Sequence, residues 1–235
     1  MLSVVLPVYN EKGNLTPLLT ELVGVLGDMP HEIIAVDDGS TDGSLEELRS
    51  LARAIRGLRI VALGRRCGQS GAILAGVDAA RGDIVVTMDA DGQNDPSDLP
   101  ALLGALDQEP SCVAAVGYRA RRADGAWKRL QSRVANAVRN WITGDVVRDT
   151  GCGLRVIRRA AALRLTRFDG MHRFVPTLLR MQGGRVVELP VRHRARVYGR
   201  SKYGMWDRAL RGLRDALGVR WLARRAVRYE VKEIV

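Results

Sequence analysis

Two carboxylates, spaced two positions apart, follow a short apolar run. Asp89 and Asp91 come directly after residues 84–88, and Gln93 follows two positions later. Carboxylate and amide oxygens are the hard ligands that Mg2+ and Mn2+ prefer beside a diphosphate, so this spacing indicates a metal site. The same residue types are also typical of a solvated turn or a helix cap, and the spacing alone leaves these alternatives open.

Five short apolar runs rich in Val and Ile alternate with stretches of helical spacing. This alternation predicts βαβ units, and therefore an α/β fold with a Rossmann-like, mostly parallel sheet and helices on both faces. Asp37 and Asp38 then fall at the end of the second strand, as Asp89 and Asp91 do at the end of the fourth. Open α/β sheets bind ligands at this edge, so we expect all four carboxylates in one crevice. The apolar runs cover residues 2–8, 32–37, 59–63, 83–88 and 112–117.

The pattern changes after residue 118, where we expect a basic helix at about 126–143 and strands at 153–158 and 185–193. We predict one domain over 1–203, divided into a first half (1–118) and a second half (119–203). A basic, amphipathic C-terminal helical segment (204–235) follows.

The formal net charge of +11 is unevenly distributed. Residues 1–118 carry a net charge of −9, and residues 119–235 carry +20. A basic half suits nucleic acid, anionic lipid or a phosphorylated substrate, and it is also typical of a solvated surface. Charge alone does not choose among these.

The compartment is predicted from cysteine usage and apolar runs. Cys67, Cys112 and Cys152 are scattered and form neither a disulfide framework nor a pair of metal-binding knuckles, which favours a reducing cytoplasm. The first residues resemble a strand rather than a signal peptide, and no run approaches the roughly 18 to 20 apolar residues of a membrane span. We therefore expect a cytoplasmic protein whose membrane contact is peripheral, at the inner face.

Three segments extend the chemistry of the first half. Pro7-Val8-Tyr9-Asn10-Glu11, the segment Val36 to Asp42, and Arg65-Arg66-Cys67-Gly68-Gln69 follow the first three strands in turn. With Asp89-Ala90-Asp91, their order resembles the nucleotide-sugar half of family 2 glycosyltransferases, which have the GT-A fold. Arg66 departs from that pattern, because relatives often have Asn there. The resemblance implies that a nucleotide-sugar is bound by Pro7, Tyr9, Glu11, Asp37, Asp38, Gly68 and Asp89, and a metal, Mg2+ or Mn2+, by Asp89, Asp91 and Gln93.

The second half resembles dolichol-phosphate mannose synthases and bacterial polyprenyl-phosphate glycosyltransferases. The resemblance rests on Gly117-Tyr118-Arg119, the segment Asp149 to Arg155, and the segment His193 to Tyr203, and it covers about residues 2–225. It implies inverting, metal-dependent transfer from a GDP- or UDP-sugar to a dolichyl or undecaprenyl phosphate. A phosphate oxygen is already anionic near neutral pH, so such an acceptor needs cations more than a general base. The candidates for binding the acceptor phosphate are Arg119, Arg133, Arg196, Ser201 and Lys202, and those for catalysis are Asp89, Asp91, Arg119, Arg133 and Lys202.

Two other functions remain as alternatives. A glycan or glycolipid hydroxyl acceptor would require a base, for which Asp149 and Asp169 are candidates, although a turn or helix cap explains either equally well. Leu217 stands where processive synthases have Gln before Arg-Trp, which argues against a processive enzyme. A basic nucleic-acid-binding module would not explain the acidic crevice, so we expect no nucleic-acid partner.

A stripe of large apolar residues marks the C-terminal segment. Trp206, Leu210, Leu213, Leu217 and Trp221 recur at helical intervals, with arginines largely on the other sides of the helix. Such a stripe either packs on the core or lies on lipid. If it lies on lipid, the expected partner is an anionic membrane surface. The resemblance further implies a separate membrane-spanning subunit, on which some soluble-type synthases rely.

Overall fold

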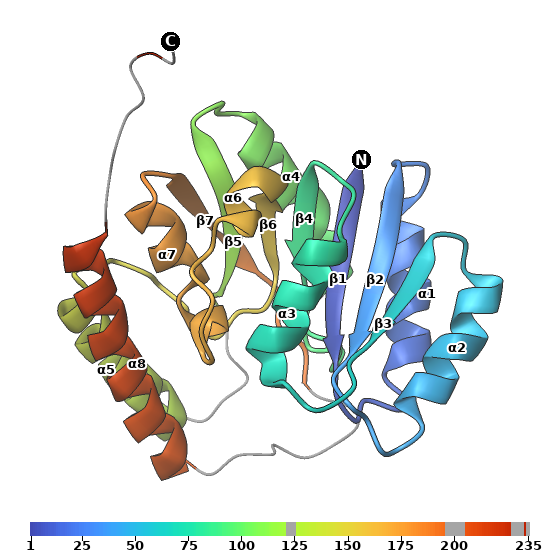
Figure 1. Ribbon diagram of the computed structural model, residues 1–235, viewed down its shortest axis with the longest axis horizontal. Helices are drawn as coiled ribbons and strands as arrows, with labels where there is room; N and C mark the ends of the chain where they lie inside the picture. The colour runs from blue at the N-terminus through green and yellow to red at the C-terminus, as the bar shows by residue number, and fades with distance from the viewer. Residues whose placement is uncertain (121–125, 196–204, 227–232, 234–235) are drawn as a thin grey trace.

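The computed structural model describes residues 1–120, 126–195, 205–226 and 233, with the backbone alone for 126–133 and 205–210. Strands and helices alternate through the first half, as the sequence predicts (Figure 1). The elements of this half are β1 (Leu2–Val8), α1 (Leu15–Leu26), β2 (His31–Asp37), α2 (Ser44–Ala54), β3 (Leu58–Ala62), α3 (Gly68–Ala79), β4 (Ile84–Thr87), η1 (Pro96–Asp98), α4 (Leu99–Asp107) and β5 (Cys112–Arg119).

The second half adds two strands and more helix. The predicted basic helix is α5 (Ala126–Thr143), while the two predicted strands are shorter than expected, at 155–158 and 185–191. The elements of this half are α5, β6 (Arg155–Arg158), α6 (Arg159–Leu163), η2 (Met171–Arg173), α7 (Val175–Met181), β7 (Arg185–Val191) and α8 (Met205–Arg225). No helix among these described residues is both long and apolar enough to cross a membrane.

Seven strands form one sheet in the order β3-β2-β1-β4-β6-β5-β7. β6 pairs antiparallel with β4 and with β5, and every other pairing is parallel, so the predicted mostly parallel sheet is confirmed. Parallel strands end at the same edge, which brings the loops after β1, β2, β3 and β4 together. β6 starts opposite Thr87 of β4, so the segment before β6 also arrives at this edge.

Helices cover both faces of the sheet, as predicted. Leucines of α1, α2 and α4 pack on one face, where Leu19, Leu48 and Leu102 are fully buried. α3, α6 and α7 cover the other face, where Phe174 and Leu179 are buried. Burying one such side chain stabilises the fold by about 1.5–3 kcal/mol, so these two cores hold the strand ends in a fixed position.

α5 and α8 lie side by side at one end of the molecule (Figure 1). Ile142 of α5 and Ala216 and Val219 of α8 join the second core. The boundary predicted at residue 204 lies outside the described residues, and the division into domains stays a prediction.

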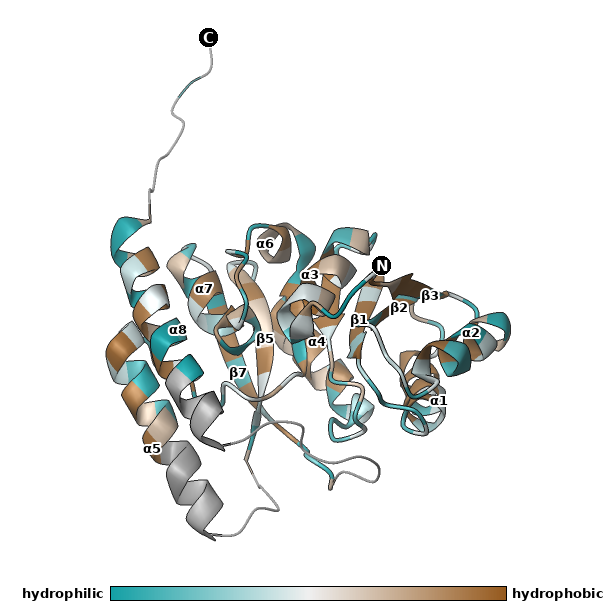
Figure 2. Ribbon diagram, turned by 60° about the horizontal axis from the view of Figure 1, so that its bottom comes forward, coloured by the Kyte–Doolittle hydropathy of each residue, from teal (hydrophilic) through white to brown (hydrophobic). Residues whose placement is uncertain are grey.

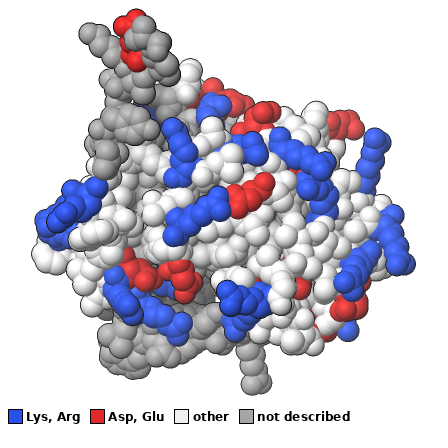
Figure 3. All heavy atoms as spheres, in the orientation of Figure 1, with Lys and Arg blue, Asp and Glu red and all other residues white. Residues whose placement is uncertain are grey.

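The apolar stripe of α8 points outward where its side chains are described. Leu213, Leu217 and Trp221 are 44%, 54% and 59% exposed, because the small Ala216 and Val219 face the core instead. Of the two alternatives for this stripe, packing on the core is therefore wrong for these three residues. Hydrophobic and hydrophilic segments alternate along α5 and α8 (Figure 2), and Lys and Arg side chains lie beside uncharged surface at the α8 edge (Figure 3).

Candidate active site

A cleft of about 1710 Å³ follows the carboxyl ends of the strands and continues to α5 and α8. The first half lines it with Pro7, Tyr9, Glu11, Asp38, Gly68, Asp89 and Asp91. The second half lines it with Arg119, Arg139, Arg148, Asp149, Gly153, Arg155, Asp169 and His172, among others. Predicted residues of both halves thus meet in one cleft, while Asp37 and Gln93 do not line it.

Asp37 differs from the other three predicted carboxylates, because it does not line the cleft. Neighbouring residues at a strand end point to opposite sides. Asp37 is 2% exposed, its Oδ2 accepts the Ser40 backbone N–H at 3.3 Å, and its Oδ1 has no hydrogen-bond partner among the described residues. The expected crevice therefore contains three of the four carboxylates, and Asp37 lies buried behind it.

Hydrogen bonds fix the loops of the nucleotide half to one another. The Thr41 backbone N–H donates to Asn10 Oδ1 at 2.8 Å, and the Asn10 N–H donates to Ser40 Oγ at 3.0 Å. Asp38 accepts the backbone N–H groups of Cys67 (2.5 Å) and Gly68 (2.8 Å) at the start of α3. The Asp38 carboxylate is thereby committed to holding this helix terminus, a role that the resemblance did not predict.

Arg66, where the sequence departs from its family, lies against Tyr9. Its guanidinium carbon is 4.1 Å from the centroid of the Tyr9 ring, within the range of a cation–π contact. Arg66 therefore covers an aromatic face of the predicted nucleotide pocket.

The Asp89–Gln93 loop is held by short contacts. The side-chain amide of Gln69 donates to Asp89 Oδ1 at 2.7 Å, and the Gln93 backbone N–H donates to Asp91 Oδ1 at 3.1 Å. A Cβ atom at position 153 would overlap the Asp89 carboxylate, so only glycine fits there without displacing it. Thr87 Oγ1 donates to the Gly153 carbonyl at 2.8 Å and fixes this close approach.

The segment after β7 braces the same loop from outside. The Arg194 backbone N–H donates to the Gln93 carbonyl at 2.9 Å, and the Gln93 amide nitrogen lies 3.3 Å from His193 Nε2. Arg194 also pairs with Glu21 at 2.6 Å and with Asp95 at 2.9 Å. His193 and Arg194 thus belong to the support of the site.

The residues at this loop suit a magnesium-type site that a substrate completes. No cluster of three or more His, Cys, Asp or Glu side chains with metal-binding geometry occurs in the described ranges. Mg2+ is commonly held by one or two carboxylates together with substrate phosphates and water, and Asp89 and Asp91 supply two carboxylates in the cleft. Gln93 has its amide nitrogen engaged, which leaves its oxygen as the group for a cation.

Arg119 forms an ion pair in the second half of the chain. Its Nε and Nη2 donate to Asp149 Oδ2 and Oδ1 at 2.6 and 2.8 Å, a bidentate pair with side-chain exposures of 18% and 4%. Burial lowers the pKa of Arg119, but the hydrogen bonds and charge of Asp149 outweigh this effect and raise it. Asp149, a candidate base, is therefore the counter-ion of Arg119, and the Gly151 backbone N–H also donates to it at 3.0 Å.

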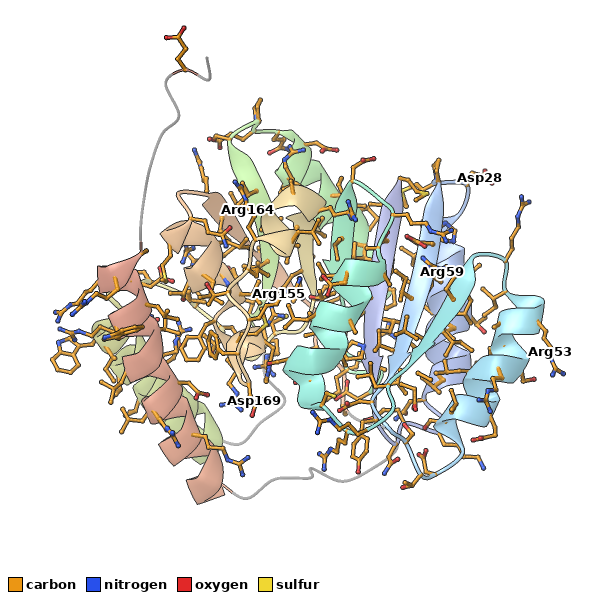
Figure 4. All side chains as sticks on the ribbon, in the orientation of Figure 1. Asp28, Arg53, Arg59, Arg155, Arg164 and Asp169 are labelled. Atoms are coloured by element: carbon orange, nitrogen blue, oxygen red, sulfur yellow. The ribbon has the colours of Figure 1, made fainter. Side chains whose placement is uncertain are left out.

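The other candidates of this half are placed less fully. Asp169, the second candidate base, is exposed at the cleft edge (Figure 4). Arg133 lies on α5, where only the backbone is described, and Arg196, Ser201 and Lys202 lie outside the described residues.

Two buried arginines were not among the site residues predicted from the sequence. Arg139 of α5 is 8% exposed and Arg155 of β6 is 3% exposed, and both line the cleft. Burial lowers the pKa of Arg155, and it lowers that of Arg139 to about 10. A guanidinium group stays protonated near neutral pH in proteins, so both residues carry a positive charge. The apolar neighbours Leu154 and Val156 were the available signal for Arg155, since a charge inside such a strand is buried.

A partly buried histidine, His172, was also not predicted from the sequence. Ser70 Oγ lies 2.8 Å from His172 Nδ1 and accepts the Gly170 backbone N–H at 3.1 Å. Burial, with Arg173 and Arg155 nearby, lowers the pKa of His172 to about 3. The imidazole is therefore neutral at working pH, and it ties α3 to the η2 segment in the wall of the cleft.

Comparison with known proteins assigns the class. The model of the Glycosyl transferase family 2 matches residues 3–166, so the chain belongs to that family, as its motifs predict. The computed fold is similar to the crystal structure of glucosyl-3-phosphoglycerate synthase from Mycobacterium tuberculosis with Mg2+ and uridine diphosphate. The TM-score is 0.70 at 23% identity, over 93% of this chain and 80% of that one, which confirms the GT-A-like fold.

Two curated relatives narrow the subgroup. The chain is 38% identical over 229 residues to dodecaprenyl-phosphate galacturonate synthase of Rhizobium johnstonii, covering 95% of this chain and 67% of the relative. It is 40% identical over 207 residues to undecaprenyl-phosphate 4-deoxy-4-formamido-L-arabinose transferase of Edwardsiella ictaluri, covering 86% and 63%. The chain spans between 60% and 67% of the length of such relatives.

Proposed function

We propose that this glycosyltransferase moves a sugar from a nucleotide-sugar to a polyprenyl phosphate, with inversion at the anomeric carbon. The observation that carries the proposal is one cleft with two environments: carboxylates at the end of β4, and arginines along β6 and α5. The names of both curated relatives describe polyprenyl-phosphate sugar transfer, which supports this acceptor class.

The first half is suited to the donor. Tyr9 offers a ring for the base, and Asp89 and Asp91 would hold Mg2+ or Mn2+ against the diphosphate. Such a cation would neutralise the charge that develops on the leaving group. A similar fold has been solved with Mg2+ and uridine diphosphate, which supports a UDP-type donor, and a GDP-sugar remains within the proposal.

The second half is suited to an anionic acceptor. A phosphate oxygen attacks the anomeric carbon as the bond from that carbon to the diphosphate breaks, so the sugar is passed on and a nucleoside diphosphate leaves. The nucleophile carries no proton, which removes the need for a base. Arg119, held by Asp149, and its neighbours position the phosphate, with Arg133, Arg196, Ser201 and Lys202 as the further predicted contacts.

A hydroxyl acceptor is the second candidate. Asp169 favours it, because this carboxylate is exposed at the cleft edge, whereas Asp149 is engaged by Arg119. This candidate requires transfer that depends on Asp169 and proceeds without a polyprenyl phosphate.

α8 and the charge of the second half suit a peripheral place at an anionic membrane. Leu213, Leu217 and Trp221 are exposed on one side of α8, and Arg214 and Arg224 lie close by on the same helix. Buried Leu and Trp add an apolar contribution, and each basic residue near an anionic leaflet contributes about 1 kcal/mol. We propose the cytoplasmic face of the membrane as the location, with a membrane-spanning subunit as a further candidate partner.

The test is a transfer assay. Purified protein is incubated with farnesyl phosphate or farnesol, Mg2+ or Mn2+, and a panel of UDP-, GDP- and dTDP-sugars, and the products are identified by mass spectrometry. We expect a glycosylated farnesyl phosphate from at least one donor, and loss of this product on chelation. Transfer to farnesol or to a glycan at equal or greater rate would instead support the hydroxyl acceptor.

A further inference from the structure

Arg139 and Arg155 are exceptional among the arginines whose side chains are described. They are the two that are more than nine-tenths buried, at 8% and 3% exposure. Neither forms a salt bridge with a carboxylate of the described residues, whereas the partly buried Arg59, Arg119 and Arg180 all do. A buried charge without a counter-ion destabilises a fold, so a reason for keeping both is needed.

Their hydrogen bonding is incomplete as well. Arg139 Nη2 donates to Asn140 Oδ1 at 2.5 Å, and Arg155 Nη2 donates to the His172 carbonyl at 2.9 Å. Arg139 Nε and Nη1 and Arg155 Nη1 have no partner among the described residues. Three charged N–H-bearing nitrogens are thus unsatisfied in the wall of one cleft.

The two guanidinium groups approach one segment from different elements. Arg139, from α5, lies 5.8 Å from the centroid of the Phe174 ring, and Arg155, from β6, holds the carbonyl of His172. Figure 4 shows Arg155 in the interior of the molecule, while Asp169 lies at the lower edge. The pair therefore forms a cationic wall behind residues 172–174, at the acceptor end of the cleft.

Two anions reach this cleft in the proposed reaction. Asp89 and Asp91 would hold the donor diphosphate through its cation, and the acceptor phosphate would require positive charge from the protein. Two of the Arg119 guanidinium nitrogens already donate to Asp149, whose charge opposes that of Arg119. A buried charge is weakly screened and attracts an anion in the cleft even where its nitrogens are covered.

We propose that Arg139 and Arg155 form the cationic wall of the acceptor-phosphate subsite. This inference rests on the proposed function and adds two residues to which the resemblance gave no role. The ligand group is a phosphate monoester, and the two charges lower its free energy in the cleft before it reaches the sugar.

The experiment measures binding and stability on matched variants. Titration calorimetry gives the affinities of farnesyl phosphate, uncharged farnesol and UDP with Mg2+. The variants are Arg139→Met, Arg155→Met and the charge-keeping Arg139→Lys and Arg155→Lys. Arg164→Met is the control, because Arg164 is exposed and lies in the upper part of Figure 4, away from Asp169 at the lower edge.

We expect each Met variant to bind farnesyl phosphate about tenfold or more weakly, because one buried positive charge that attracts the phosphate is removed. Farnesol and UDP binding should change less than about twofold, and the Lys variants should keep most of the affinity. Melting temperatures should stay within about 2 °C of the wild type or rise, since a buried unpaired charge is removed.

Unchanged farnesyl phosphate affinity in both Met variants would overturn the inference, and so would an equal loss of UDP affinity. A large fall in melting temperature with rescue by neither Lys variant would assign both arginines to structure. If the wild type binds farnesyl phosphate no better than farnesol, the proposed acceptor itself is wrong. The affinity of the wild type for farnesyl phosphate thus tests the proposed acceptor, and the affinities of the variants test the role of Arg139 and Arg155.

Discussion

The two halves of the cleft are built by different means. In the nucleotide half, functional candidates stand in loops directly after β1, β2 and β4, and backbone N–H groups fix them, as in the bonds from Cys67 and Gly68 to Asp38. In the acceptor half, long side chains cross between elements, as in the pair of Arg119 with Asp149, 30 residues away. Strand ends place the first set, whereas packing and charge pairing place the second.

This difference has a mechanistic meaning. A cation and a diphosphate need carboxylates at fixed positions, which loops tied by backbone hydrogen bonds supply. In the proposed reaction an anionic acceptor needs concentrated positive charge, which the buried arginines would supply at a cost in stability. Variants in the first half should therefore reduce turnover with the donor, and variants in the second should change acceptor affinity and stability.

Replacing Asp91 should have the largest effect. Asp91→Ala removes one of the two carboxylates in the cleft, and we expect transfer to fall by about 10³-fold or more, because preorganised electrostatic stabilisation of the leaving group is lost. Steady-state kinetics give the effect, and circular dichroism checks the fold. The exposed Asp107→Ala serves as the control. Transfer surviving in Asp91→Ala, or under thorough chelation in the wild type, would contradict the metal-dependent donor site.

Adding a methyl group at position 153 tests the close approach of Gly153 to Asp89, where the two halves of the cleft meet. Gly153→Ala would drive its Cβ into the Asp89 carboxylate, and we expect about a 10²-fold loss of transfer with weaker UDP·Mg2+ binding. Gly104→Ala on α4 is the matched control, since nothing lies within 4 Å of its added methyl. Equal activity of the two variants would show that the Gly153–Asp89 approach has no functional role.

The outward side of α8 should contribute to membrane binding and contribute little to the stability of the fold. Replacing Leu213, Leu217 and Trp221 by Ser should weaken binding to anionic vesicles about tenfold or more, because apolar area is lost from the contact. Their exposure predicts an unchanged melting temperature and unchanged UDP binding. Cosedimentation with anionic and neutral vesicles measures the effect. Normal vesicle binding by the variant would assign this surface to a protein partner.

Replacing His172 should have the smallest effect, which is on the pH dependence of stability. Its pKa is about 3 in the fold and about 6.5 when unfolded, so the unfolded chain binds the extra proton between these values. The contribution of neutral His172 to stability is present above pH 6.5 and is lost as the pH falls towards 3. Melting temperatures at pH 7.5 and 5.5 should therefore differ less in His172→Gln than in the wild type. An unchanged difference would show that other groups govern this window.

The fold and the donor side could be predicted from sequence because both depend on local pattern. Apolar runs gave the strands, and the residues after each run had to meet at one edge of a parallel sheet, as Tyr9, Asp38, Asp89 and Asp91 do. Asp37 was misplaced because a strand end turns adjacent side chains in opposite directions. Asp37 and Asp38 are adjacent along the chain, and this shift by one position decides which of the two side chains faces the cleft.

The acceptor side could not be predicted to the same depth, because charge counts do not give partners. The sequence does not show that Arg119 forms an ion pair with Asp149. Nor does it distinguish Arg139, which packs on Phe174, from the other basic residues of its helix. Asp149 likewise changed from candidate base to counter-ion. These assignments depend on contacts between distant segments, which spacing along the chain does not encode.

One measurement tests the two-part cleft most directly: titration of the wild type and of Asp91→Ala with UDP·Mg2+ and, separately, with farnesyl phosphate. We expect Asp91→Ala to lose UDP·Mg2+ binding and to bind farnesyl phosphate within about twofold of the wild type, since the second half of the cleft holds its phosphate. Loss of both ligands together, or retention of UDP·Mg2+ binding by the variant, would contradict this expectation.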